Sequence, residues 1–103
     1  MKVKVCKVTD VGENSMKSFD VNGEAVLMAN VKGEFLSIAD TCSHAMAYLS
    51  EGELLEGCQV QCPDHGAIFD LKTGEALALP AVSPVERYQV VIDGDDVYIE
   101  TAE

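Results

Sequence analysis

Apolar residues recur along most of this chain in short stretches with the two-residue period of a β-strand. Charged and apolar residues alternate in residues 2–9, and residues 25–29 form an apolar run. Strands are predicted over residues 2–9, 24–31, 34–39, 60–62, 67–70, 75–79, 87–92 and 97–100. Short strands with turn signals about every 8–12 residues are typical of sandwiches and barrels. The pattern therefore predicts an all-β fold, a small antiparallel sandwich or barrel.

Turn residues join some of these strands into hairpins. Lys32-Gly33 separates two predicted strands and indicates a β-hairpin. Asp93-Gly94-Asp95-Asp96 indicates a second hairpin, which joins residues 87–92 to residues 97–100. Residues 46–57 are the one stretch where a helical turn is considered, and the two glycines in it would keep that turn short.

Length and composition predict one domain over residues 1–103. A chain of 103 residues, 48% of them apolar, is long enough for one ordinary core and too short for two. Residues 1–7 alternate charged and apolar side chains, unlike a signal peptide. No stretch approaches the roughly 20 apolar residues that cross a bilayer. We therefore expect a cytoplasmic protein without a membrane partner, in which cysteines stay reduced.

The net charge of −11 is unevenly distributed. Residues 1–32 contain five basic and four acidic residues, whereas residues 33–103 contain 14 acidic residues and only Lys72 and Arg87. Phosphate backbones would repel such a surface, so nucleic acid is not an expected partner. The charge suits docking onto a basic protein surface. It is equally consistent with a solvated acidic face that only keeps the protein in solution.

Two short clusters of cysteine and histidine carry the candidate chemistry. Cys42-Ser43-His44 is followed, after 17 residues, by Cys62-Pro63-Asp64-His65-Gly66. Together they contain both histidines and two of the four cysteines of the chain. Thiolates and imidazoles suit zinc or iron–sulfur clusters rather than calcium or magnesium. The sequence therefore predicts a metal site made by Cys42, His44, Cys62 and His65.

The arrangement of the four ligands bears on the choice of metal. Structural zinc accepts two cysteines and two histidines, and a zinc-stabilised protein-interaction module is the alternative function. Zinc fingers, however, usually pair cysteine with cysteine and histidine with histidine. Here each cluster mixes one cysteine with one histidine, which favours two bridged irons, one held by thiolates and the other by imidazoles.

The two clusters resemble the Rieske [2Fe–2S] motif, and further segments agree with this resemblance. They are Leu49-Ser50-Glu51-Gly52, Ile68-Phe69-Asp70, Thr73-Gly74-Glu75 and Leu79-Pro80. From about residue 40 onwards the chain resembles the soluble Rieske-type ferredoxins that supply ring-hydroxylating oxygenases, including archaeal relatives. The resemblance implies a Rieske-like fold whose cluster-binding subdomain consists of two loops.

The resemblance also implies the role of each ligand. Cys42 and Cys62 would bind the inner iron, and His44 and His65 would bind the outer iron through Nδ1. The chain would then be a one-electron carrier and not an enzyme, with no catalytic residues of its own. Its expected partners are a reductase and a terminal oxygenase or another redox protein, and we expect it to be a monomer.

Four positions differ from the Rieske proteins of cytochrome complexes. Ala47 and Asp64 stand where those proteins have a pair of disulfide-forming cysteines, so that disulfide cannot form. Ala67 and Phe69 stand where those proteins have a serine and a tyrosine that donate hydrogen bonds to cluster sulfurs. Fewer donors disfavour the reduced cluster, so we expect a reduction potential of about −150 mV, the low end of the Rieske range.

The remaining cysteines, Cys6 and Cys58, are expected to be free thiols that pack as small hydrophobic residues. Because Cys58 lies four residues before Cys62, it is also considered as a further thiolate ligand, which would leave one histidine unused. The rim of the site is expected to include Met46, Pro63 and Pro80.

Overall fold

The computed structural model describes residues 1–41, 47–63, 66–79 and 83–101. Within these residues it is all-β, as predicted, with two single 3-10 turns, η1 (Val8–Asp10) and η2 (Leu49–Glu51). The strands are β1 (Lys2–Lys7), β2 (Ser15–Val21), β3 (Glu24–Val31), β4 (Glu34–Ala39), β5 (Glu53–Leu55), β6 (Gln59–Gln61), β7 (Ile68–Asp70), β8 (Ala76–Ala78), β9 (Arg87–Tyr88), β10 (Val90–Asp93) and β11 (Asp96–Glu100). None of the helices in the described residues is long and apolar enough to span a membrane.

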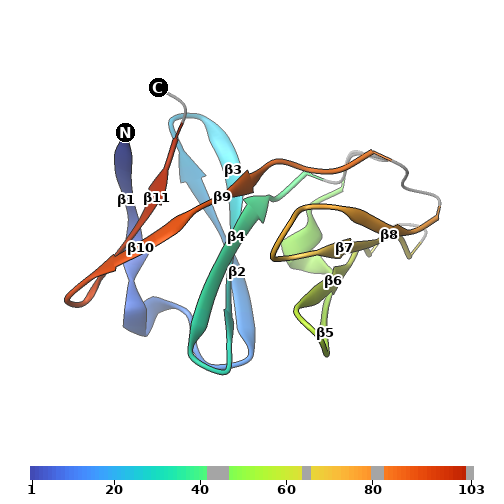
Figure 1. Ribbon diagram of the computed structural model, residues 1–103, viewed down its shortest axis with the longest axis horizontal. Helices are drawn as coiled ribbons and strands as arrows, with labels where there is room; N and C mark the ends of the chain where they lie inside the picture. The colour runs from blue at the N-terminus through green and yellow to red at the C-terminus, as the bar shows by residue number, and fades with distance from the viewer. Residues whose placement is uncertain (42–46, 64–65, 80–82, 102–103) are drawn as a thin grey trace.

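The strands form three antiparallel sheets that follow one another along the long axis of the molecule (Figure 1). Their strand orders are β1-β11-β10, β2-β3-β4-β9 and β5-β6-β7-β8. The first two sheets make up the basal part of the molecule, and the third, with η2, is called the cluster subdomain below. The chain ends lie together at the basal part, where the N-terminal amine donates a 3.0 Å hydrogen bond to the carbonyl oxygen of Thr101.

The β3–β4 hairpin occupies the residues predicted for it. Val31 pairs with Glu34, and the two turn residues have positive φ angles, 53° at Lys32 and 90° at Gly33. Two consecutive positive φ angles define the type I′ turn, whose twist matches that of the flanking strands. The turn fixes the register of β4, the strand that leads to the first cysteine–histidine cluster.

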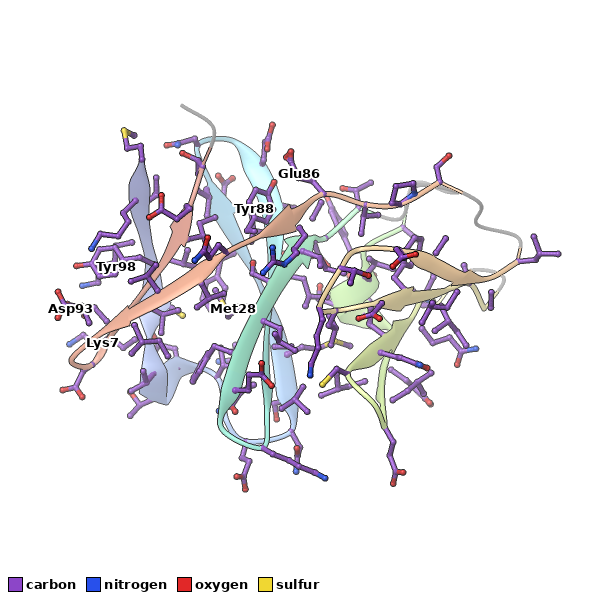
Figure 2. All side chains as sticks on the ribbon, in the orientation of Figure 1. Lys7, Met28, Glu86, Tyr88, Asp93 and Tyr98 are labelled. Atoms are coloured by element: carbon purple, nitrogen blue, oxygen red, sulfur yellow. The ribbon has the colours of Figure 1, made fainter. Side chains whose placement is uncertain are left out.

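Strand β3 is buried on both faces, which explains why it is an apolar run and not an alternating strand. Leu27 and Ala29 point into a core that is shared with the cluster subdomain. Val26 and Met28 point into a second core, between the two basal sheets (Figure 2). One strand therefore connects the packing of the basal part with the packing around the candidate site.

The predicted strand over residues 87–92 is two strands that belong to different sheets. Tyr88 in β9 pairs with Ser37 of β4, whereas Val91 in β10 pairs with Tyr98 of β11. The chain crosses between the sheets at Gln89, whose carbonyl oxygen accepts a hydrogen bond from the Glu100 amide. Tyr88 and Val90 both pack against the second core, so the alternation continues through the crossing and conceals it.

Two strands were not predicted, and several ends differ. Strand β2 has polar residues at most positions and lies at the edge of its sheet, so its apolar periodicity is weak. The segment after residue 46 contains the helical turn considered above, as η2, but also the short strand β5. Strand β1 ends at Lys7, two residues early, because Val8–Asp10 forms η1 and the Asp10 carboxylate accepts a hydrogen bond from the Lys7 amide.

Candidate metal centre

Cys62 is the predicted ligand that the structure describes. It directly follows β6, it is 2% exposed, and its backbone N–H donates a 2.7 Å hydrogen bond to the carbonyl oxygen of Ala67. This bond closes the segment between β6 and β7, and Gly66 in it has a φ of 77° that favours glycine. The thiol of Cys62 is thus held at the base of a closed loop. Cys42, His44 and His65 lie outside the described residues.

The segment that carries Cys42 and His44 also begins and ends at fixed points. Thr41 and Tyr48, on either side of it, form an antiparallel bridge. The Leu49 N–H donates a 2.6 Å hydrogen bond to the carbonyl oxygen of Asp40. Both candidate ligand segments therefore have ends that backbone hydrogen bonds hold together.

Gly52 brings the end of the first segment against the start of the second. A Cβ atom at this position would overlap the carbonyl oxygen of Gln61 and would lie 3.1 Å from Cδ of Pro63. Gln61 and Pro63 flank Cys62, so the chain that leaves η2 packs directly against the strand end that carries this ligand. The sequence identified Gly52 as a residue that shortens a helical turn and as part of a segment that agrees with the resemblance, but it did not indicate this contact.

Cys6 and Cys58 lie apart from each other. Cys6 is buried in the second core on β1, as expected for a small hydrophobic residue. Burial raises the pKa of the Cys6 thiol above its usual value; the charge of Asp10 raises it further and that of Lys17 opposes the shift. Cys58 is half-buried between β5 and β6, with a φ of 61°, and packs at the edge of the first core. In the described part of the chain, no three acidic, cysteine or histidine side chains form a further metal site.

Ala67 and Phe69 are fully buried on the side of the site that follows Cys62. Neither side chain can donate a hydrogen bond, so these two positions offer no hydroxyl group to a bound metal cluster. Of the expected rim, Pro63 is exposed, whereas Met46 and Pro80 lie outside the described residues. Leu79, next to Pro80 in the chain, is 77% exposed.

A family model described as the Rieske [2Fe-2S] domain matches residues 1–89. The chain belongs to the Rieske [2Fe–2S] family. This membership determines the cofactor, one Rieske-type [2Fe–2S] cluster, and decides against the zinc site considered above. The chemistry of the donors fits it, because two thiolates and two imidazoles are the ligand set of such a cluster. Of these donors, the Cys62 thiol is described by the structure, buried directly after β6.

Two relatives that match this chain along nearly its whole length are named as ferredoxins of dioxygenase systems. The ferredoxin subunit of 3-phenylpropionate/cinnamic acid dioxygenase from Escherichia coli K12 is 42% identical over 102 residues, which cover 99% of this chain and 95% of that protein. The ferredoxin of carbazole 1,9a-dioxygenase from Nocardioides aromaticivorans IC177 superposes with a TM-score of 0.92 at 35% identity and covers 96% of each chain. This Rieske domain is accordingly an electron carrier and not a catalytic subunit.

A second solved structure contains a ferredoxin together with an oxygenase. It is a complex of reduced oxygenase and oxidized ferredoxin in carbazole 1,9a-dioxygenase, with a TM-score of 0.87 at 30% identity. The match covers 95% of this Rieske domain and 91% of that chain. The likeness therefore extends over nearly the whole chain and is not confined to the two cysteine–histidine clusters.

Proposed function

We propose that this Rieske domain carries single electrons from a reductase to a terminal oxygenase or to another oxidoreductase. The observation that carries the proposal is the 42% identity, over 99% of the chain, to a protein named as the ferredoxin subunit of a dioxygenase. The solved complex of a related ferredoxin with its oxygenase supports the same type of partner. The proposal also includes a cytoplasmic location and a monomeric state.

The proposed ligands are Cys42 and Cys62 for the inner iron and His44 and His65 for the outer iron. The burial of Cys62 supports its place on the inner side, and the closed ends of both segments support a preformed site. When bound, the [2Fe–2S] group supplies reversible one-electron chemistry. The chain contributes a fixed ligand geometry, an apolar surround with few hydrogen-bond donors, and a surface for partners.

The test is purification under anaerobic conditions, followed by iron and sulfide analysis and electron spin resonance. We expect about two irons and two inorganic sulfides per chain, a brown colour, and a reduced-state signal of low average g value. Addition of an NADH-dependent dioxygenase reductase should bleach the visible absorption, and addition of an oxygenase component should restore it. One zinc per chain without sulfide would overturn the cofactor assignment, and a cluster that no such reductase reduces would overturn the proposed partner.

The missing hydroxyl groups predict a low reduction potential and a way to raise it. Ala67→Ser would add one donor beside Cys62, and we expect it to raise the potential by roughly 50 mV or more, a modest part of the Rieske range. Ala29→Ser is the matched control, because Ala29 is also fully buried in the first core but lies on β3. Protein-film voltammetry measures the reduction potentials of the two variants and of the parent protein. A wild-type potential above about +100 mV would contradict the argument from hydrogen bonding.

Acidic residues next to Cys62 are candidates for partner docking. Glu51 and Glu53 line a shallow hollow together with Cys62, Pro63 and Gly66. Both acidic side chains are exposed. Negative charge beside an electron-transfer site would steer a basic partner surface towards it at low ionic strength.

Neutralising these two charges is expected to slow reduction by the partner reductase. In Glu51→Gln/Glu53→Gln the association rate should fall about three- to tenfold at low salt, and the difference should vanish near 0.5 M salt because exposed charges are then screened. Asp93→Asn/Asp95→Asn removes the same charge at the hairpin most distant from the cluster subdomain (Figure 2). Stopped-flow traces that show equal slowing for both double variants would assign the effect to net charge alone.

A further inference from the structure

Asp40 is the one charged side chain that is buried among the described residues, with an exposure of 0%. Both of its carboxylate oxygens accept hydrogen bonds from one residue, Ser50. Oδ1 accepts from the Ser50 backbone N–H at 2.7 Å, and Oδ2 accepts from the Ser50 hydroxyl at 2.7 Å. Among the described residues, both oxygens of the carboxylate therefore have the same partner, a residue from the far end of the first ligand segment.

The backbone of Asp40 is fixed as well. Its N–H donates a 3.1 Å hydrogen bond to the carbonyl oxygen of Ala25 in β3, and its carbonyl oxygen accepts from Leu49. Asp40 directly follows β4, and Ser50 lies in η2. These contacts tie the central basal sheet, the start of the first ligand segment and its end to a single residue.

Closing a loop with a buried carboxylate carries a free-energy penalty for removing the charge from water. In its described residues, the second ligand segment is closed by the backbone hydrogen bond between Cys62 and Ala67 and by a 3.3 Å hydrogen bond that the Gln61 side-chain amide donates to the carbonyl oxygen of Gly66, and both are bonds between neutral groups. Burial of a carboxylate is penalised unless strong hydrogen bonds compensate for it, and charge-assisted bonds of 2.7 Å are of that kind. Asp40 lies two residues before Cys42, so the costly group is next to a proposed ligand. A purely structural tie would not need a charge at this place.

We propose that Asp40 and Ser50 form a clamp that positions Cys42 and His44 for the cluster and places a buried negative charge beside it. Asp40 is then a positioning residue for the electron-transfer centre, and its charge lowers the reduction potential. The proposal rests on the ligand set put forward under the proposed function. It concerns residues that contact neither the metal nor a partner directly.

The matched pair Ser50→Ala and Ser37→Ala tests the positioning part. Ser37 is also buried, and its hydroxyl donates a 2.9 Å hydrogen bond to the carbonyl oxygen of Leu27 within the basal sheet. Ser37→Ala loses a hydroxyl hydrogen bond between neutral groups and should lower Tm by about 4–8 °C, and Ser50→Ala loses a charge-assisted one and should lower Tm by up to about twice as much. Only Ser50→Ala should also broaden the electron spin resonance signal and shorten the half-life of the cluster against a chelator by about two- to tenfold. Ser50→Thr, which keeps the hydroxyl, should restore the parent signal width and the parent cluster half-life.

The variant Asp40→Asn tests the charge and also serves if Ser50→Ala does not fold. The amide oxygen can accept from the Ser50 N–H while the amide nitrogen donates to the Ser50 hydroxyl, so the clamp persists without its charge. We expect the reduction potential to rise and the cluster half-life to stay within about twofold of the parent, because the contacts remain.

The outcomes separate the clamp from the function on which it rests. If Ser50→Ala behaves like Ser37→Ala in signal width and half-life, the positioning role is wrong. If Asp40→Asn leaves the potential unchanged, the role of the charge is wrong. In both cases the parent protein would still contain its cluster. Absence of a cluster from the parent protein would instead overturn the proposed ligand set.

Discussion

Replacing Cys62 by alanine is expected to abolish cluster binding while the basal sheets stay folded. Cys62 is the buried thiol at the end of β6, and a thiolate is the only ligand that this strand end offers. Cys62 is one member of a core in which Leu27, Ile38 and Phe69 also join the basal part to the cluster subdomain, and we expect these larger side chains to keep the core together without the cluster. We therefore expect a colourless protein with less than about a tenth of the parent iron content and a lower but still cooperative Tm.

Cys58→Ala is the control for this prediction. Cys58 lies four residues away, carries a free thiol, and has been considered as a further ligand. Its carbonyl oxygen accepts a hydrogen bond from the Leu71 N–H, a contact that alanine retains. We expect the parent iron content, colour and spin resonance signal in Cys58→Ala. Loss of the cluster from this variant, or its retention in Cys62→Ala, would show that the ligand set has been assigned incorrectly.

Periodicity was sufficient to predict most of the fold because most strands keep one partner and one buried face. β3 and β4 lie exactly where the sequence places them, since a two-residue turn fixes both ends. Periodicity cannot report a change of partner, and for that reason the crossing at Gln89 was missed. It is also weak on an edge strand such as β2, where the sheet and not the side chains specifies the conformation.

The cofactor could be inferred from the sequence because its ligands lie in two short clusters. The supporting contacts could not, because the segment Leu49-Ser50-Glu51-Gly52 agrees with the family resemblance but does not say which residues Ser50 and Gly52 contact. Asp40 reads as an ordinary acidic residue until the structure places Ser50 against it. Gly52 reads as a helix breaker until the carbonyl oxygen of Gln61 is found where a side chain would lie. The contact of Gly52 with Gln61 leads to a prediction about a residue that is not itself a ligand.

Gly52→Ala adds a single methyl group, but we expect it to displace the second ligand segment. Gly52 has a φ of −89° and a ψ of −144°, so a left-handed backbone is not what favours glycine at this position. The cause is space: the new Cβ would overlap the Gln61 carbonyl oxygen, a backbone atom that moves only if β6 moves. Such overpacking typically costs about 1–3 kcal/mol. Because Gln61 precedes Cys62, we expect both a lower free energy of unfolding and a lower cluster occupancy.

Gly12→Ala separates this effect from the general consequences of replacing glycine by alanine. A Cβ at Gly12 would lie 3.8 Å from the Ser15 hydroxyl oxygen, an ordinary contact on an exposed turn. Alanine there should leave unfolding within about 0.5 kcal/mol of the parent or slightly raise stability, since the unfolded chain loses freedom. Urea unfolding measures the free energy of unfolding, and iron content per chain measures the cluster occupancy. Parent-like iron content and stability in Gly52→Ala would mean that β6 yields to the extra methyl group, and that the contact between η2 and β6 does not hold Cys62 in place.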